Sequence, residues 1–443
     1  MKIIIAGAGD VGTHLAKMLS KESHTIVLLD EKAEKIKALE NNYDILAIVG
    51  SPTSLKDLRE AQVPTADLFV AVTPYESTNI TACLLATNLG AQKTLARIDS
   101  NEYLLPKNKE FFKSMGVDSL IYPEMLAANE IVNGLKKGWV RQYVELSDGA
   151  LIVLATKIRA NSPLCNVPLE KAFEGNGLVR IVVIKRGNVT IIPTGKDCVQ
   201  NNDIAYFITT KEGVEEVRIK SGKEDFDINN IMFVGASRIG IKTIQNLPKG
   251  KDVKVIEQDI DKTYRIIEQT NNTLVINGDG RDLSLLKEED IESFDAFVAL
   301  TGNSETNILA CLTAKQFGVK RTIAEVENMD YIPMAESLDI GSIINKKIIA
   351  ASHIYQLILG GNVSVRCLTF ANVEVVELVA EEGSYITTDC LKNLKLPKNT
   401  TIGGIVRYNK GIVAVGDTKI KAGDNVTVFC GEYTIQKIEK LFK

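Results

Sequence analysis

The chain of 443 residues repeats itself at a shift of 228 positions. "IIIAGAGDVG" (3–12) matches "IMFVGASRIG" (231–240), and "DLFVAVT" (67–73) matches "DAFVALT" (295–301). "TNITACLLA" (78–86) keeps the same register with "TNILACLTA" (306–314). Such self-similarity at one fixed shift indicates a duplicated domain. The sequence therefore predicts two copies of one fold.

Each copy begins as a strand, a glycine-rich turn, a helix and a second strand that ends in an acid. In the first copy these are "KIIIAG", "DVGTHLAKMLS" and "TIVLLD". The strands are apolar throughout, which is typical of a parallel sheet with both faces covered by helices. We therefore predict an α/β fold with two tandem Rossmann-like, doubly wound parallel sheets.

A different pattern follows each copy. Residues 140–210 and 366–432 contain short alternating strands, which match at an offset of 221. That offset places Arg186 on Arg407 and Asp203 on Asp424. We therefore expect a small α+β domain after each Rossmann-like domain. The Rossmann-like domain of each copy is called its nucleotide-type domain, and the small domain its C-terminal domain.

These patterns divide the chain into seven segments. We expect a Rossmann-like domain at 1–122, a joining helix at 123–139, a small C-terminal domain at 140–219, a linker at 220–228, a second Rossmann-like domain at 229–344, a second joining helix at 345–365 and a second small C-terminal domain at 366–443.

The first turn has the spacing G-x-G-x-x-G at Gly7, Gly9 and Gly12. The first glycine permits the tight turn, the second lets the backbone approach a pyrophosphate, and the third lets the helix pack closely on the strand. Asp30 ends the second strand, where a carboxylate binds both ribose hydroxyls and repels a 2′-phosphate. The pattern favours a nucleotide site that prefers NAD to NADP. The alternative is a turn that only packs.

The second copy differs at several of these positions. Ser237 replaces the middle glycine, Arg238 stands where the first copy has Asp10, and Glu257 ends the second strand. Arg97, at the end of a later strand, is matched by Glu325. We expect the two sites to differ in affinity and ligand.

Other polar residues follow strands whose carboxyl ends line the same crevice. They are Ser51, Thr73 and Pro74 in the first copy, and Asp279 and Thr301 in the second. Their hydroxyls and carboxylates are suited to ribose or base. The alternative for Thr73 and Thr301 is that they cap the following helices.

Several classes of protein are disfavoured. The net charge of −4 provides no positive surplus to hold nucleic acid. No apolar run approaches the roughly 18 residues that span a bilayer, so we expect a cytoplasmic protein. The seven cysteines and three histidines show no metal-ligand spacing. No residue is placed to transfer a proton to a nicotinamide, which favours binding without catalysis.

The order of modules resembles that of a known family. "AGAGDVG", "TPYESTNITACLLA" and "PEMLAANEI", followed by "GASRIG" and "TGNSETNILACLTAK", resemble the TrkA family of regulatory subunits of bacterial potassium uptake channels. The resemblance covers essentially the whole chain. It implies two tandem RCK (KTN) units in a homo-oligomer, a tetrameric gating ring, docked beneath a TrkH-type membrane channel subunit on the inner face of the membrane. It also implies binding of NAD(H), and of ATP or ADP, in the Rossmann halves.

Carried over by motif, the resemblance places the nucleotide contacts on two sets of residues. Together with the crevice residues above, the candidate site comprises Gly7, Ala8, Gly9, Asp10, Val11, Gly12, Asp30, Ser51, Thr73, Pro74 and Arg97 in the first copy, and Gly235, Ala236, Ser237, Arg238, Ile239, Gly240, Glu257, Asp279 and Thr301 in the second.

Two other functions stay open at this point. One is an NAD-dependent oxidoreductase with an unusual active site. The other is a ligand sensor for a different transporter, in which the C-terminal domains bind an effector such as a cyclic dinucleotide.

Overall fold

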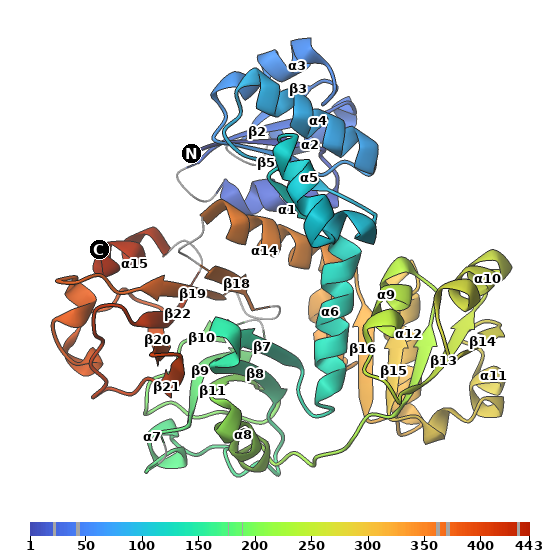
Figure 1. The fold of residues 1–443 in the computed structure, drawn as a ribbon. Coiled ribbons are helices and arrows are strands. Elements are labelled where there is room, and N and C mark those ends of the chain that lie inside the picture. The colour runs from blue at the N-terminus through green and yellow to red at the C-terminus, as the bar shows by residue number, and fades with distance from the viewer. Residues whose placement is uncertain are drawn as a thin grey trace. The chain divides into compact units, whose positions relative to one another are not determined.

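A computed structural model describes residues 1–20, 24–40, 45–175, 177–187, 189–359, 364–368, 373–431 and 435–443 (Figure 1). The chain divides into two compact units. One comprises Met1–Leu126 with Lys346–Gly360, and the other comprises Ala127–Asn345 with Gly361–Lys443. Among the described helices, none is long and apolar enough to cross a membrane.

The first nucleotide-type domain is a six-stranded parallel sheet in the order β3-β2-β1-β4-β5-β6. This is the strand order of a dinucleotide-binding fold. Successive strands are added on one side of β1 up to β3, and from β4 onward they are added on its other side. Ile4, Val27 and Phe69 are fully buried in its core. The strands are β1 (Lys2–Ala6), β2 (Thr25–Asp30), β3 (Leu46–Val49), β4 (Leu68–Ala71), β5 (Thr94–Arg97) and β6 (Ser119–Ile121); the helices are α1 (Asp10–Leu19), α2 (Ala33–Glu40), α3 (Leu55–Glu60), α4 (Glu76–Leu89) and α5 (Pro106–Ser114).

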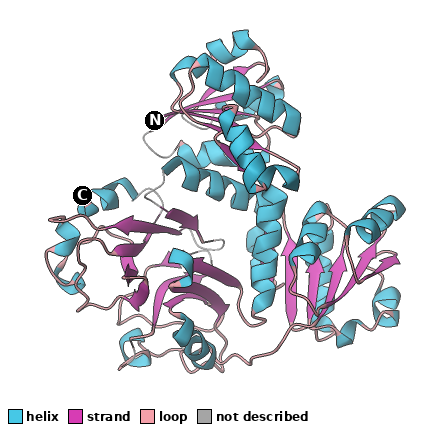
Figure 2. Ribbon diagram, in the orientation of Figure 1, coloured by secondary structure: helices cyan, strands magenta, loops and turns pink. Residues whose placement is uncertain are grey.

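The second nucleotide-type domain repeats this order as β14-β13-β12-β15-β16-β17. Figure 2 shows its strands as a row of arrows flanked by helices. The predicted pair of doubly wound sheets is confirmed. Its strands are β12 (Asn230–Val234), β13 (Asp252–Glu257), β14 (Thr273–Asn277), β15 (Ala296–Ala299), β16 (Arg321–Glu325) and β17 (Ser342–Ile344); its helices are α9 (Arg238–Asn246), α10 (Ile260–Gln269), α11 (Leu283–Glu288), α12 (Ser304–Gln316) and α13 (Ile332–Ser337).

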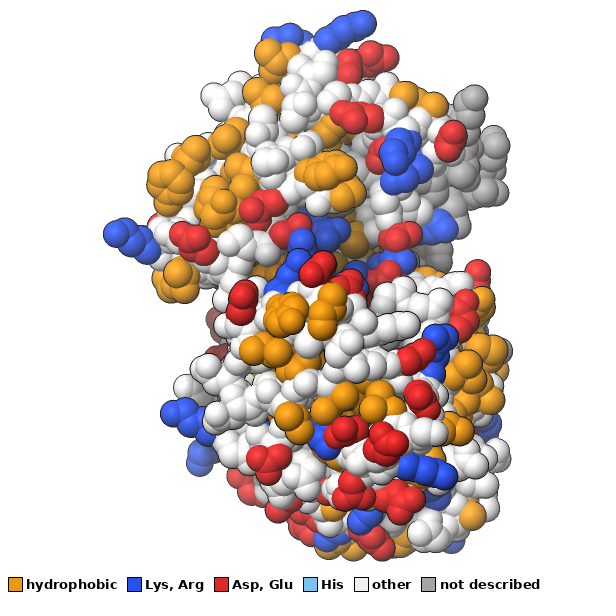
Figure 3. All heavy atoms as spheres, turned by 90° about the vertical axis from the view of Figure 1, so that its right-hand side faces the viewer, with side chains coloured by type: hydrophobic (Ala, Val, Ile, Leu, Met, Phe, Trp, Pro, Cys, Tyr) orange, Lys and Arg blue, Asp and Glu red, His pale blue; other side chains and the backbone are white. Residues whose placement is uncertain are grey.

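The outer edge of this domain exposes single apolar side chains. Ile260, Tyr264 and Leu274 are each at least half exposed on α10 and β14. Figure 3 faces this side of the domain, where hydrophobic side chains alternate with charged ones. Such scattered apolar residues are ordinary on a protein surface. This face therefore does not by itself indicate a binding surface.

Each C-terminal domain is a five-stranded antiparallel sheet with the same topology. The orders are β10-β9-β11-β8-β7 and β21-β20-β22-β19-β18. The first contains β7 (Gln142–Leu146), β8 (Leu151–Lys157), β9 (Val179–Arg186), β10 (Val189–Ile191), β11 (Ile204–Thr209), α7 (Leu169–Ala172) and α8 (Val214–Lys220); the second contains β18 (Ser364–Cys367), β19 (Val373–Val379), β20 (Thr400–Arg407), β21 (Lys410–Val413), β22 (Asn425–Gly431) and α15 (Ile435–Phe442).

The residues matched by the offset of 221 form the same ion pair in both C-terminal domains. The Arg186 guanidinium donates to the Asp203 carboxylate at 2.8 Å, and that of Arg407 donates to Asp424 at 2.7 Å. Both aspartates are 2% exposed. The pairs compensate the burial of these carboxylates, because a buried charge needs a partner.

The joining helices are α6 (Pro123–Lys136) and α14 (Lys346–Leu359). Of the second predicted joining helix, 345–365, residues 360–363 lie outside the described residues, and Ser364 and Val365 belong to strand β18 instead. Each helix packs against the copy that it does not follow. In the first unit α14 lies along α1. In the second unit Gly134 of α6 lies against Arg321 and Ile323 of β16. The sequence predicted the helices but not this exchange.

Candidate nucleotide-binding sites

The first glycine-rich turn connects β1 to α1. Gly7 has a φ of +112°, and a Cβ there would lie 2.9 Å from the backbone nitrogen of Thr73. A Cβ at Gly12 would overlap the carbonyl oxygen of Gly7, whereas a Cβ at Gly9 would have no neighbour within 4 Å. The outer two glycines are thus needed for the turn and for its packing. The middle glycine leaves open space beside the N-terminus of α1, which is where a phosphate binds in such folds.

Asp30 at the end of β2 holds this turn in place. Its carboxylate accepts the N–H of Ala8 at 2.6 Å and the N–H of Lys32 at 2.9 Å. An ionised carboxylate has about four acceptor positions. The remaining capacity suits the two hydroxyls of a ribose.

The ends of β4 and β5 are joined by a buried side chain that the sequence interpretation missed. Asn79 is fully buried; it accepts the N–H of Thr73 at 2.9 Å and the Thr73 hydroxyl at 2.7 Å. It donates to the carbonyl oxygens of Thr73 and Arg97. Asn307 repeats these contacts with Thr301 and Glu325. The repeated "TN" of both copies was the available signal.

The helix-capping alternative for the two threonines is wrong. The residue that precedes α4 is Tyr75, whose side chain makes no cap hydrogen bond. The residue that precedes α12 is Asn303, whose side chain accepts the N–H of Thr306 at 2.7 Å. Thr73 and Thr301 instead bond to the buried asparagines, which fixes them at the crevice.

Other predicted residues of the first copy already contact side chains of this same chain. Arg97 lies with its Nη2 3.4 Å from Glu124 Oε1 and 3.7 Å from Asp99 Oδ1. Asp10 is mostly exposed and pairs with Lys347 of α14 at 2.8 Å. The predicted residues that remain are Val11, which is buried in α1, Ser51, whose N–H donates to Asp57 at 2.8 Å, and Pro74, which is exposed after β4.

The second glycine-rich turn has the same backbone design. Gly235 has a φ of +97° and approaches Leu300 and Thr301 closely. Glu257 accepts the N–H of Ala236 at 2.5 Å and the N–H of Asp259 at 2.8 Å, as Asp30 does in the first copy. Glu257 is only 8% exposed, whereas Asp30 is half-buried. The acid of the second crevice is therefore less accessible to a ligand.

The substitutions in the second copy also change the space around this turn. Ser237 is the N-cap of α9, and its hydroxyl accepts the N–H of Gly240 at 3.2 Å. Arg238 is exposed in the first turn of α9, and Ile239 is buried beneath it. The Ser237 side chain occupies the position that Gly9 leaves open. The space left for a phosphate beside the N-terminus of α9 is therefore smaller than that beside α1.

Two charged positions at the strand ends of the second crevice differ from those of the first copy. Glu325, at the position of Arg97, is buried. Asp279 is bound by Arg281 at 2.8 Å, and this hydrogen-bonded pair lowers the pKa of Asp279. Arg281 was not predicted, although it lies in "GDGRD" beside the strand end. The two crevices therefore present different charges.

The thiols next to the strands do not add a nucleophile. Burial raises the pKa of Cys311 to about 12 and that of Cys83 further. Both thiols therefore stay protonated at neutral pH. In the described part of the chain, no group of three or more His, Cys, Asp or Glu residues could hold a metal ion.

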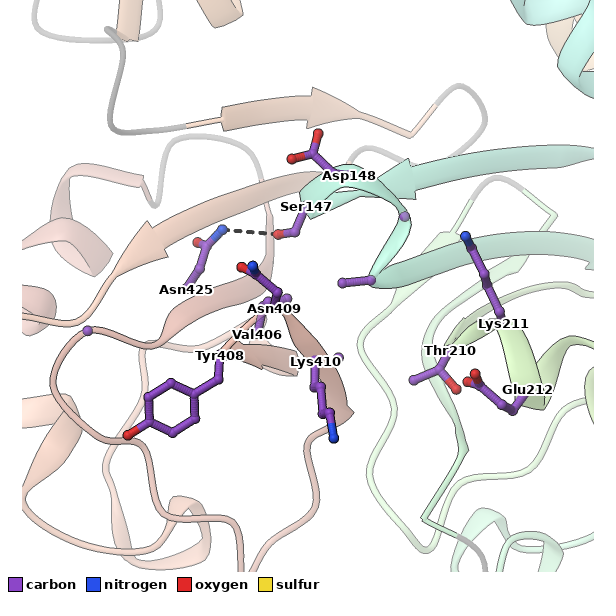
Figure 4. A pocket seen from close by; sticks show the side chains of 14 residues that line it. Ser147, Asp148, Thr210, Lys211, Glu212, Val406, Tyr408, Asn409, Lys410 and Asn425 are labelled. Atoms are coloured by element: carbon purple, nitrogen blue, oxygen red, sulfur yellow. Dashed lines mark hydrogen bonds between the residues drawn. The ribbon is translucent and has the colours of Figure 1, made fainter.

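A separate cleft of about 850 Å³ lies between the two C-terminal domains (Figure 4). Across it, Asn425 donates to the Ser147 hydroxyl at 3.0 Å, and Tyr408 is almost fully exposed. Its side chains are mixed in charge, with Asp148, Lys211, Glu212 and Lys410 among them. The cleft has the size of a small-molecule site.

Two tandem parallel sheets, each with a glycine-rich turn tied to a strand-ending acid, have the fold and the turn geometry of dinucleotide-binding domains. The structure is similar to "Crystal Structure of the GsuK RCK domain" (14% identity, TM-score 0.61, covering 100% of this chain and 94% of that one). It is also similar to "GsuK channel bound to NAD" (14% identity, TM-score 0.62, 100% and 78%).

Sequence comparison identifies the family. The TrkA-N domain model matches residues 3–123 and 231–346, and the TrkA-C domain model matches 375–443. The chain is 31% identical to the Trk system potassium uptake protein TrkA of Haemophilus influenzae and 31% identical to that of Vibrio alginolyticus, over 100% of this chain and 99% of each relative. The chain belongs to the TrkA family of Trk system potassium uptake proteins.

Proposed function

We propose that the chain is the nucleotide-binding regulatory subunit of a Trk-type potassium uptake system. The observation that carries this proposal is the duplicated turn, in which Asp30 or Glu257 accepts the N–H of the residue after the first glycine. Full-length similarity to the family and likeness to a channel bound to NAD support it.

The first crevice is the principal NAD(H) site, and it also accepts ATP or ADP. The diphosphate lies over Gly9 and the N-terminus of α1, and Asp30 binds the ribose. The proposed site comprises Gly7 to Gly12, Asp30, Ser51, Thr73, Pro74 and Arg97. Arg97 reaches a ligand by exchanging its contact with Glu124, which at 3.4 Å is loose.

The second crevice is a weaker site or one with a different ligand. It comprises Gly235 to Gly240, Glu257, Asp279 and Thr301. Three features support the difference: the burial of Glu257, the side chain of Ser237 and the pairing of Asp279 with Arg281.

Regulation requires no covalent chemistry. A nucleotide that binds one arrangement of a homotetrameric ring better shifts the population toward that arrangement. A coupling free energy of about 1–3 kcal/mol changes the ratio of open to closed channels by roughly 5- to 150-fold. The ring docks on a TrkH-type channel subunit at the cytoplasmic face of the membrane.

The test is Rb⁺ flux into vesicles that carry the cognate channel. NADH, NAD, ATP or ADP is added with the full-length protein, and NADH absorbance is followed in the same sample. We expect flux that depends on the nucleotide at constant absorbance, and Asp30→Ala should reduce this dependence.

The other outcomes identify the alternatives. Steady loss of NADH absorbance with a small metabolite would make the protein an oxidoreductase. If no nucleotide changes the Rb⁺ flux and the protein copurifies with another transporter, the protein is a sensor for that transporter.

A further inference from the structure

A second pocket, of about 460 Å³, lies within the second unit, and the glycine-rich turn of that unit does not line it. One wall is the end of β8 and the segment 222–226 after α8, from the first C-terminal domain. The other wall is the start of β16 and the turn 339–341 before β17. Strands β16 and β17 are parallel, and the pocket lies where both of them begin. This is the amino edge of the second sheet, opposite its nucleotide crevice.

The walls carry an excess of positive charge. Seven lining residues are basic and two, Glu224 and Asp339, are acidic. The seven are Arg141, Lys157, Arg159, Lys223, Lys315, Lys320 and Arg321.

One carboxylate serves four of these cations. Asp339 forms ion pairs with Lys157 at 3.1 Å, with Lys315 at 3.3 Å, and with Arg141 and Arg159. A single negative charge cannot neutralise four positive ones, so the potential in the pocket stays positive.

Arg321 is the strongest sign of a missing partner. It is 4% exposed, and its Nε and Nη2 atoms have no hydrogen-bond partner. Its Nη2 atom lies toward α6, where a Cβ at Gly134 would be 3.0 Å from it, so the absent side chain of Gly134 leaves room for the guanidinium. An unpartnered buried guanidinium is costly, because its donors have lost water without replacement.

Two pKa values in the pocket are lowered, mainly by burial, and the neighbouring cations add to the effect. Burial, with Arg141 nearby, lowers the pKa of Arg321 to about 9. Burial, with Arg159 and Arg141, lowers the pKa of Lys223 to about 8. Both groups are still mostly charged at pH 7.

We propose that this pocket binds a small phosphate-bearing anion that carries at least two negative charges. Guanidinium and ammonium groups bind phosphate oxygens through charge-assisted hydrogen bonds. The volume is in the range of small-molecule sites. Trp139 and Phe226 add an apolar wall, with Lys320 held over the Phe226 ring at 5.4 Å.

The corresponding edge of the first copy has a different charge. The strand registers of β5 with β6 and of β16 with β17 place Asp118 at the position of Gly341. The Asp118 carboxylate accepts the N–H of Thr94 at 2.8 Å. Gly341 presents no carboxylate at that position, so the two copies are not equivalent here.

A bound anion would contact both the first C-terminal domain and the second nucleotide-type domain. It therefore stabilises the packing of these two domains, by mass action on the folded arrangement that holds it. The inference does not depend on the proposed function, because none of its residues lies in either nucleotide crevice.

The test uses the full-length protein with inorganic pyrophosphate and ADP as probes in titration calorimetry. We expect saturable pyrophosphate binding. Lys320→Gln and Lys223→Gln should each weaken it by about 10- to 100-fold, the loss of one charged hydrogen bond. Lys287→Gln is the matched control, because Lys287 is also exposed and lies over a ring, that of Phe317, but outside the pocket. It should leave affinity unchanged.

A variant of opposite sign gives a second readout. Asp339→Asn removes the internal competing charge, so it should strengthen pyrophosphate binding in protein that still unfolds cooperatively. Equal affinities for pyrophosphate and ADP would assign an inorganic diphosphate, and tighter ADP binding that Lys320→Gln weakens would assign a nucleotide. Absence of pyrophosphate binding, or binding that Lys223→Gln and Lys320→Gln leave unchanged, would overturn the proposal.

Discussion

Removal of the Asp30 carboxylate is the sharpest test of the first crevice. The carboxylate accepts two backbone N–H groups, at 2.6 and 2.9 Å, and in the proposed site it also accepts two ribose hydroxyls. A hydrogen bond to a charged group contributes about 1.5–3 kcal/mol. Loss of both ribose contacts in Asp30→Ala should therefore cost at least about 3 kcal/mol of binding free energy, or about 100-fold in NADH affinity.

The matched control is Asp67→Ala. Asp67 lies at the opposite edge of the same sheet, and its carboxylate also accepts a backbone N–H at 2.6 Å, that of Lys2. Both variants should lower the free energy of unfolding by about 1–3 kcal/mol, since each leaves an N–H without its acceptor. Only Asp30→Ala should weaken the binding of NADH.

The assay is titration calorimetry with NADH and NADPH, beside urea unfolding of each variant. Asp30→Asn keeps the shape but removes the charge that repels a 2′-phosphate, so it should shift the preference toward NADPH. If Asp30→Ala and Asp67→Ala change NADH affinity equally, or if neither does, the assignment of Asp30 to the ribose is wrong.

The remaining predictions concern the turn, the strand ends and the ion-pair network. Gly9→Ala should fold normally, because a Cβ there has no neighbour within 4 Å, yet bind NADH more weakly; Gly12→Ala should unfold at markedly lower urea, because its Cβ overlaps the Gly7 carbonyl, and equal stability of the two would contradict the packing argument. Asn79→Ala should lower the free energy of unfolding by about 3 kcal/mol, because the backbone groups of Thr73 and Arg97 lose a buried partner. An exposed control on the same helix, Asn88→Ala, should change it little. Asp339→Asn should destabilise the protein at pH 7, because Arg141, Lys157, Arg159 and Lys315 hold the pKa of Asp339 well below its usual range. A carboxylate with a lowered folded-state pKa stabilises the fold above its unfolded pKa of about 4 and loses this contribution as the pH falls further. The difference in unfolding free energy between Asp339→Asn and wild type should accordingly shrink below about pH 4, and a constant difference would contradict the ion-pair account.

Local sequence determined much of the molecule. The repeat predicted two copies of one parallel sheet, because apolar strands and a helical spacing recur in the same register. The glycine spacing predicted the turn, since Gly7 and Gly12 sit where any side chain meets backbone. The match of Arg186 and Asp203 to Arg407 and Asp424 likewise predicted an equivalent pair of residues in both C-terminal domains. These features depend on neighbours along the chain or on the repeat itself.

Only the tertiary structure decided which parts pack together. The amphipathic pattern of α6 and α14 shows that each buries a face, but it does not say against which copy, because both copies offer similar surfaces. The packing of α14 on α1 and of α6 on β16 therefore had to come from the fold. The basic pocket likewise joins residues from four distant segments, 138–161, 222–226, 315–322 and 339–341. No spacing along the chain reveals such a cluster, because its charges are brought together by long-range contacts alone.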